Sequence, residues 1–204
     1  MKDGCRITPL AVMVLALLRE GDMHPYEMIR LMRQRHENRL VTLTNGTLYH
    51  TVARLTAAGL LAEVGTDREG NRPERTTYTL TADGRDAVAH WVRHELARID
   101  HPAEFRVALA ESHNLPRPEV AELLAARREA LAAEHAMHRD GLVKARHREV
   151  PEQYLVEIDR QTALLDAELR WTDTFLARLG DTVWGPPRDN APAEAPTHRE
   201  ATHA

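Results

Sequence analysis

The sequence is poor in cysteine, aromatic residues and lysine. Its single cysteine, Cys5, excludes a disulfide within the chain and is typical of a protein in a reducing compartment. Aromatic residues make up only 4% of the chain, and this scarcity, together with many alanines and leucines, favours helices over a β sandwich. No apolar run is long enough to span a membrane, and residues 1–6 do not lead into a signal peptide of the usual form. We therefore expect a cytoplasmic protein.

Motifs of common enzymes are also missing from the sequence. It contains no glycine-rich phosphate-binding loop, no Gly-x-Ser-x-Gly turn and no evident partner that would make Cys5 a nucleophile. The twelve histidines include two helically spaced pairs, His90–His94 and His135–His138, but neither has the His-Glu-x-x-His pattern. Either pair could bind a metal, although such pairs are more often ordinary surface residues. We expect no catalysis, no metal and no other cofactor.

The net charge of −4 does not by itself indicate a nucleic-acid-binding protein. The charge is uneven, however, because the first hundred residues are nearly neutral and the remainder is acidic. Only Lys2 and Lys144 are lysines, so nearly all basic side chains are arginines. Arginine clusters in the first half, such as Arg30 to Arg39, can still contact phosphates, since the local field matters more than the total charge.

The segment 43–61 is predicted to form one amphipathic helix with a polar start. Thr44 is a favourable N-cap, because its side-chain oxygen can accept a hydrogen bond from the first turn, and Gly59 is a favourable end. The two faces differ in polarity at helical spacing. The apolar face comprises Leu48, Val52 and Leu55, and the polar face comprises Thr47, His50, Thr51 and Arg54. This polar face is either an ordinary solvated surface or one that enters a DNA groove.

Two helices are predicted before this segment. They begin at Thr8-Pro9 and at Pro25, because proline is tolerated in the first turn of a helix. After the segment, residues 60–65 and 75–80 are predicted to form a β-hairpin with an arginine-bearing tip. Thr81 is expected to cap a fourth helix, with an apolar face of Val88, Trp91, Val92, Leu96 and Ile99. This order is that of a winged helix-turn-helix, in which the third helix enters the major groove and the wing contacts phosphates or the minor groove.

The second half of the chain is predicted to consist of long helices. Prolines 102, 116 and 118 separate a short helix over 105–113 from long helices over 119–147 and 152–179. The last helix has apolar positions at coiled-coil spacing, and three further side chains widen that stripe. The spaced positions are Ile158, Thr162, Leu165, Leu169, Thr172, Leu176 and Leu179, and the additional ones are Leu164, Trp171 and Phe175. So broad a surface predicts a homodimer.

The fold class is therefore expected to be mainly α, with an N-terminal winged helix-turn-helix and a C-terminal dimerisation domain of long helices. We expect the winged domain over residues 1–100 and the dimerisation domain over 101–180. The tail, 181–204, is expected to be disordered, since Pro, Ala, His and charged residues dominate it.

Several short motifs together resemble the PadR family of bacterial transcriptional regulators. The motifs are Tyr26-Glu27, Gly46-Thr47-Leu48-Tyr49, Leu55 to Leu60, and the run Tyr78, Leu80, Thr81 and Gly84 at the end of the wing. Two positions depart from the family pattern: Pro25 replaces a frequent glycine, and His50 replaces the usual proline. Segments 104–110 and 167–171 are more loosely similar to longer members, including virulence activators, and this similarity implies a helical dimerisation domain.

The resemblance and the element order predict a homodimeric regulator, most simply a repressor, that binds a pseudo-palindromic operator in double-stranded DNA. The predicted DNA-binding residues are Thr44, Asn45, Gly46, Thr47, Tyr49, His50, Thr51, Arg54, Arg68, Arg72 and Arg75. The predicted dimerisation residues are Ile158, Leu165, Leu169, Trp171 and Leu176. Tyr49 could instead place its ring in the core.

Two alternatives stay open at this stage. Some PadR-like regulators bind flat aromatic compounds between tryptophans at the dimer interface, so the resemblance implies that Trp91 could form the wall of a site for a small aromatic effector. It could equally be a core residue of the fourth helix. The alternative function is a protein-interaction or adaptor module, in which the winged helix is structural and the long helices bind a partner protein.

Overall fold

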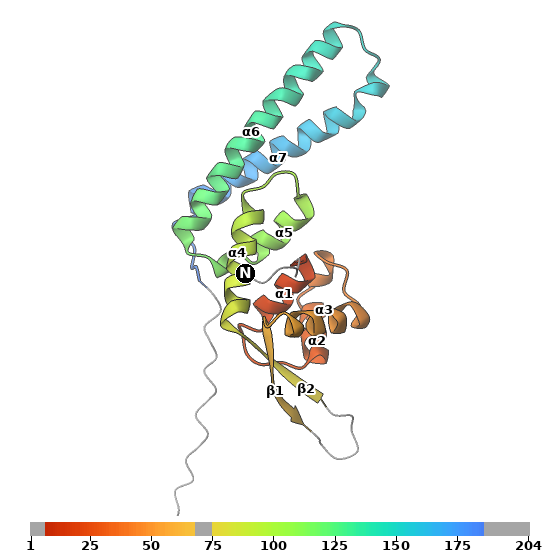
Figure 1. Ribbon diagram of the computed structural model, residues 1–204. Helices are drawn as coiled ribbons and strands as arrows, with labels where there is room; N and C mark the ends of the chain where they lie inside the picture. The colour runs from red at the N-terminus through yellow and green to blue at the C-terminus, as the bar shows by residue number, and fades with distance from the viewer. Residues whose placement is uncertain (1–6, 68–74, 186–204) are drawn as a thin grey trace, which may run out of the picture.

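The computed structural model describes residues 7–67 and 75–185 and shows a mainly helical protein with a two-stranded wing (Figure 1). Its helices are α1 (Pro9–Leu17), α2 (Pro25–Gln34), α3 (Asn45–Ala57), α4 (Ala82–Leu96), α5 (Pro102–Ala110), α6 (Arg117–His147) and α7 (Val156–Leu179). Its strands are β1 (Leu61–Asp67) and β2 (Arg75–Leu80), and short 3-10 turns cover Glu37–Arg39, Ser112–Asn114 and Glu152–Tyr154. The predicted element order and fold class are confirmed.

The starts of the helices follow local signals in the sequence. The Thr8 hydroxyl accepts a hydrogen bond from the Ala11 amide at 3.3 Å, and the Thr81 hydroxyl accepts one from the Gly84 amide at 3.0 Å. Helix α2 begins at Pro25 as expected. Two boundaries differ from expectation: α5 begins at Pro102, and the segment before α7 forms a separate 3-10 turn at Glu152–Tyr154.

The wing is an antiparallel pair in which Leu61 lies opposite Leu80 and Asp67 lies opposite Arg75. Its base is joined to the loop before α2, because Met23 and Tyr78 exchange two backbone hydrogen bonds of 3.1 Å. The wing is thereby fixed to the helical body at the end nearest α4.

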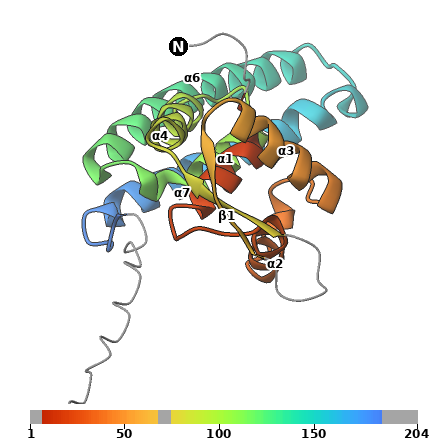
Figure 2. The same cartoon turned by 60° about the horizontal axis from the view of Figure 1, so that its bottom comes forward.

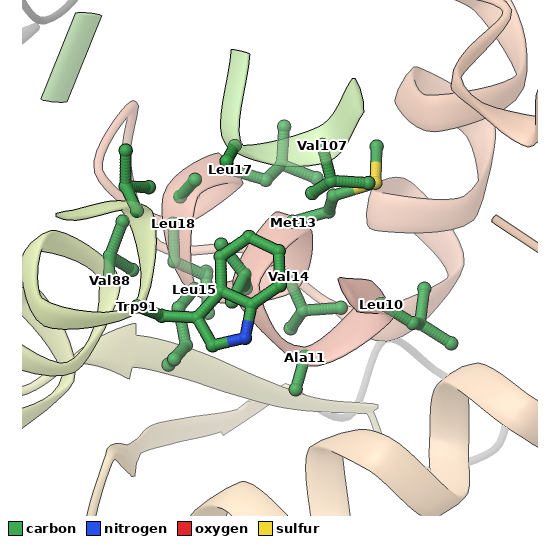
Figure 3. Packing of buried hydrophobic residues seen from close by; sticks show 14 of the residues in the cluster. Leu10, Ala11, Met13, Val14, Leu15, Leu17, Leu18, Val88, Trp91 and Val107 are labelled. Atoms are coloured by element: carbon green, nitrogen blue, oxygen red, sulfur yellow. The ribbon is translucent and has the colours of Figure 1, made fainter. Parts of the chain in front are cut away.

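Helix α1 forms the centre of the hydrophobic core. Every residue from Leu10 to Leu18 is buried, and α3, α4 and α5 surround the helix (Figure 3). The same cluster of buried side chains continues through Phe105 of α5, Val120 and Leu124 of α6, and Leu179 of α7. The core therefore crosses the domain boundary expected near residue 101 without a gap.

Helices α6 and α7 pack along each other and form an arm that projects from the winged part (Figure 1). All seven positions predicted from the coiled-coil spacing in α7 are buried or half-buried. Leu165 is only 4% exposed, because α6 of the same chain covers this side of α7. Much of the stripe is thus used within the chain, whereas Leu164 and Trp171 remain exposed at 46% and 38%.

The first residues after α7 are packed against the body of the protein. The indole of Trp184 donates to the Leu115 carbonyl at 2.9 Å, and Arg117 donates to the Gly180 carbonyl at 2.6 Å. The expectation of a disordered tail from residue 181 is wrong for residues 181–185, because these contacts hold them, and residues 186–204 lie outside the described ranges. None of the helices in the described ranges is long and apolar enough to cross a membrane.

Candidate nucleic-acid interface

Helix α3 begins with a reciprocal cap between Thr44 and Thr47. The Thr47 amide donates to the Thr44 hydroxyl at 3.1 Å, and the Thr44 amide donates to the Thr47 hydroxyl at 2.9 Å. The Thr47 hydroxyl also lies 3.0 Å from the Thr44 carbonyl, to which it donates. Both predicted site residues are exposed, but their hydroxyls already have partners in the cap.

The solvent face of α3 differs from the predicted face at Thr51. This side chain is only 8% exposed, and its hydroxyl donates to the Thr47 carbonyl at 2.8 Å. Thr51 cannot present its hydroxyl to DNA in this conformation, so its assignment as a surface contact is corrected. Leu48, Val52 and Leu55 are buried as predicted. The exposed face comprises Asn45, Gly46, Thr47, Tyr49, His50, Ala53 and Arg54.

Two arginines connect α3 to its neighbours. Arg33 of α2 donates to the Asn45 side-chain oxygen at 3.4 Å, and Arg54 donates to the Thr8 hydroxyl at 3.3 Å. Tyr49 is 47% exposed, so its ring is not a core residue. Within the described part of the chain, neither the Tyr49 hydroxyl nor the His50 ring has a hydrogen-bond partner. Both residues are exposed.

The charge around α3 favours an anionic partner. The sequence contains no Asp or Glu between Asn38 and Ala62, although Asp and Glu outnumber Lys and Arg in the whole chain. Arg30 and Arg33 of α2 are exposed next to this stretch. Arg35 is different, because both its terminal nitrogens bind the Glu20 carboxylate, at 2.5 and 2.6 Å. The arginine cluster of α2 is therefore only partly available to a ligand.

The base of the wing adjoins the first half of α3. Burial raises the pKa of Tyr78 in β2, with smaller contributions from Glu63 of β1 and Tyr49 of α3. Helices α2 and α3 and the wing occupy the end of the molecule away from the arm, which Figure 2 brings forward. Arg75 begins β2, whereas the predicted contacts Arg68 and Arg72 lie outside the described residues.

Trp91 is a core residue. It is 8% exposed and lies among Val14, Leu15 and Val88 at the packing surface of α1 and α4 (Figure 3). Neither of the two pockets described for this chain includes Trp91. The hypothesis that Trp91 forms a ligand wall is therefore wrong for this conformation, because its side chain is buried in the hydrophobic core.

An aromatic pair, with Trp171 exposed and Phe175 half-buried, instead lies on α7. Trp171 stacks on Phe175 with ring centroids 5.2 Å apart and an interplanar angle of 8°. Among the predicted dimerisation residues, Trp171 is exposed, and Ile158, Leu169 and Leu176 are half-buried. Leu165 is covered within the chain, so it contributes no accessible surface.

A pocket that the sequence did not reveal lies between α1, α2 and α5. Its volume is about 240 Å³, and its wall includes three carboxylates, Glu20, Glu37 and Glu111, together with Arg35 and His113. Burial raises the pKa of Glu111 to about 7, and the nearby charge of Glu37 raises it further. Burial also raises the pKa of Glu37 and lowers that of His113. The residues come from distant segments, so no local motif predicts their proximity.

The side chains that the structure describes contain no group of three or more His, Cys, Asp or Glu residues that could hold a metal ion. The structure therefore adds no metal site to the interface.

The helices, the capped third helix and the paired strands define a winged helix-turn-helix protein. Residues 14–90 match the model of the transcriptional regulator PadR-like family. Residues 14–90 therefore form a PadR-like domain, which is typical of a family of transcriptional regulators. The family is one of regulators rather than enzymes. Among curated proteins, no significant match is found.

Solved structures of transcriptional regulators resemble the chain at low identity. PadR from Bacillus subtilis in complex with operator DNA is 19% identical, with 84% of this chain and 99% of that chain covered and a TM-score of 0.38. The same protein in complex with p-coumaric acid is 18% identical, with coverage of 88% and 100% and a TM-score of 0.36. The regulator Cth-833 from Clostridium thermocellum is 28% identical, with coverage of 40% and 74% and a TM-score of 0.33. The family assignment rests on residues 14–90.

Proposed function

We propose that the protein is a homodimeric repressor that binds a pseudo-palindromic operator with two copies of α3. The observation that carries the proposal is the exposed face of α3. This face presents Asn45, Tyr49, His50 and Arg54 within a stretch that has no carboxylate, beside the wing and away from the arm. Phosphate-rich DNA suits such a surface.

Within this proposal, the first half of α3 reads base edges and the surrounding groups hold phosphates. Asn45, Tyr49 and His50 supply side chains for the major groove, because the N-terminal residues of a recognition helix contact base edges. The backbone amides near Thr44 and Gly46 and the guanidinium of Arg54 contact phosphates. The wing arginines, Arg68, Arg72 and Arg75, add contacts to the flanking backbone.

The proposed dimer forms through the arm, where Trp171 and Leu164 are exposed and Ile158, Leu169 and Leu176 are half-buried. A twofold dimer presents two recognition helices at a fixed separation, which dictates the spacing of the operator half-sites. Bound there, the protein represses transcription by occupying the promoter in the cytoplasm. A small aromatic effector is proposed to release it, and the stacked Trp171–Phe175 pair offers an aromatic face for such a compound.

A mobility-shift titration with the DNA upstream of the protein's own gene tests the proposal. We expect a saturable shift by the dimer that competitor DNA of unrelated sequence does not abolish, and that weakens steeply as salt is raised. Analytical ultracentrifugation of the same sample establishes the oligomeric state. A folded dimer that produces no shift at low salt would refute DNA binding, whereas a folded monomer that binds DNA would refute the dimer alone.

The second candidate function is an adaptor whose long helices bind a partner protein. The observation in its favour is that Trp171, stacked on Phe175, is exposed on the acidic half of the chain. The absence of carboxylates between Asn38 and Ala62 argues against it, because an unused winged helix needs no such surface. A charge-reversing Arg54→Glu variant separates the two, since it abolishes DNA binding and leaves partner binding by the arm intact.

A further inference from the structure

One buried arginine occupies a position in α6 where an apolar side chain would be expected. Val120, Leu124 and Leu131 are buried and lie four and seven residues apart, so they form one stripe along the helix. Arg127 falls on the same stripe, between Leu124 and Leu131, and is only 1% exposed. A charge at such a position is costly unless it is paired and hydrogen-bonded.

Arg127 connects three helices through two kinds of contact. Its Nε and Nη2 atoms both donate to one carboxylate oxygen of Glu168 in α7, at 3.0 and 2.6 Å. The Cζ atom of its guanidinium lies over the ring of Phe105 in α5, 3.5 Å from the ring centroid. Within the described residues, the buried Nη1 atom has no hydrogen-bond partner.

The position of Arg127 is the point at which the arm leaves the main core. Val120 and Leu124 belong to the hydrophobic cluster built around α1, whereas Leu131 and Leu142 are buried outside that cluster, within the arm. Phe105 belongs to the main cluster and Glu168 to the arm, so Arg127 links the two sides. Rigid planar groups held by a ring and a carboxylate tolerate few orientations.

We infer that Arg127 is a positioning residue for operator binding, because it fixes the angle between the arm and the winged domain. This inference rests on the proposed dimer, in which that angle sets the distance between the two recognition helices. An apolar residue at 127 would fill the same space without imposing a direction. The ion pair between buried Arg127 and half-buried Glu168 therefore selects one half-site spacing rather than adding stability.

The variant that tests this role replaces the pair by apolar side chains, Arg127→Met with Glu168→Leu. Such a replacement of a buried ion pair by residues of similar volume tends to preserve folding. The matched control is Arg128→Met with Asp173→Leu, which removes the neighbouring pair between the same two helices at exposed side chains. Thermal unfolding of all three proteins checks that each is folded.

The first measurement is a spin-label distance and needs no DNA. Labels are placed at Val64→Cys in the wing and Val143→Cys in the arm, both exposed, in a Cys5→Ser background. Dilution with unlabelled protein restricts the signal to distances within one chain. We expect a narrow distribution in the wild type and the control and a broad or shifted one in the Arg127→Met/Glu168→Leu protein. An unchanged distribution in that protein overturns the inference.

The second measurement is operator affinity as base pairs are added or removed between the half-sites. One added pair rotates a half-site by roughly 35°, so the wild type and the control should bind about tenfold more weakly. For the Arg127→Met/Glu168→Leu protein, the same added base pair should change operator affinity by less than about threefold. If operator affinity depends on half-site spacing equally in the wild type and in the Arg127→Met/Glu168→Leu protein, the inference is overturned. The wild type could bind no operator while the distance distribution broadens in the Arg127→Met/Glu168→Leu protein. In that case the proposed function fails, and the role of Arg127 in positioning the arm stands.

A conservative variant covers the case in which the double replacement does not fold. Arg127→Lys keeps the charge but loses the planar stack on Phe105 and the two-point contact with Glu168. We expect a broadened label distribution and a flattened spacing profile for this variant as well. A folded Arg127→Lys protein with wild-type values in both measurements overturns the inference.

Discussion

Gly84 of α4 lies against the backbone carbonyl of Leu60, so closely that a Cβ atom at position 84 would be 2.3 Å from the carbonyl oxygen. The same Cβ would be 2.6 Å from a methyl group of Leu80. This close approach places the start of α4 on the junction between α3 and β1, where Thr81 also donates to the Leu60 carbonyl at 3.0 Å. Helix α3, the wing and α4 are thereby held together at one point.

Gly84→Ala is expected to lower the free energy of unfolding by about 2–4 kcal/mol, because the backbone around Leu60 must move to admit the methyl group. Gly141→Ala is the matched control, since a Cβ there meets no atom within 4 Å and the residue lies within α6. The control should be stabilised by up to about 1 kcal/mol. Denaturant unfolding compares the two, and equal effects would contradict the close approach.

The cap of α3 predicts a second stability effect. Thr44→Ala removes the acceptor for the Thr47 amide and should cost about 1 kcal/mol in unfolding free energy. Thr42→Ala, at an exposed residue just outside the helix, serves as the control and should change stability by less than about 0.5 kcal/mol. Urea denaturation measures both variants. A Thr44→Ala protein as stable as the control would show that the cap contributes nothing.

The proposed role of α3 predicts different outcomes for two of its residues. Arg54→Ala should weaken operator binding about tenfold and lower the slope of log affinity against log salt by about 1. Thr51→Ser should leave affinity unchanged, because Thr51 is 8% exposed and its hydroxyl is bonded within the helix. Fluorescence anisotropy over a salt series measures the operator affinity of both variants. The control is Arg139→Ala, at an exposed residue of α6. Unchanged affinity in Arg54→Ala would exclude that residue from the interface.

The carboxylate pocket predicts a pH dependence of stability. Burial raises the pKa of Glu111 from 4.5 to about 7 in the folded protein. Between these two values the unfolded chain ionises while the folded protein keeps the proton, so the contribution of Glu111 to stability falls as pH rises and levels off above about 7. Glu111→Gln should therefore match the wild type near pH 4.5 and exceed it by on the order of 2 kcal/mol at pH 8.

Unfolding of both proteins from pH 4 to 8 measures this difference, with Glu129→Gln at an exposed α6 carboxylate as the control. The control should follow the wild type at every pH. A difference between Glu111→Gln and the wild type that does not grow with pH would contradict the burial of the Glu111 carboxylate.

Local signals explain why so much of the winged part was predictable. Thr8, Thr44 and Thr81 each precede a helix and act in it as the N-cap, and such signals depend only on neighbouring residues. Thr51 shows the limit, because a threonine beside an apolar stripe can be buried when its hydroxyl bonds one turn back. Which residues of a helix are covered by neighbouring elements depends on the tertiary structure. The spacing of apolar residues in α3 therefore did not predict the burial of Thr51.

The second half was predicted less completely for a related reason. The coiled-coil spacing in α7 predicts which positions are buried but not whether another helix of the same chain or a second chain buries them. Helix α6 of the same chain covers Leu165. The pairing of Arg127 with Glu168 and the proximity of Glu20, Glu37 and Glu111 join residues far apart in sequence. The sequence left two interpretations of Trp91 open, a ligand wall and a core residue. Its burial in the core depends on the tertiary packing of α1 and α4.

The burial of α1 on all sides also has a consequence for synthesis of the chain. Leu10 to Leu18 leave the ribosome before α4 and α5, which cover much of them and end only at Leu96 and Ala110. Until then this apolar segment stays uncovered and is a natural target for chaperones that bind nascent chains. The winged part of the protein therefore reaches its stable form only after α5 has been translated.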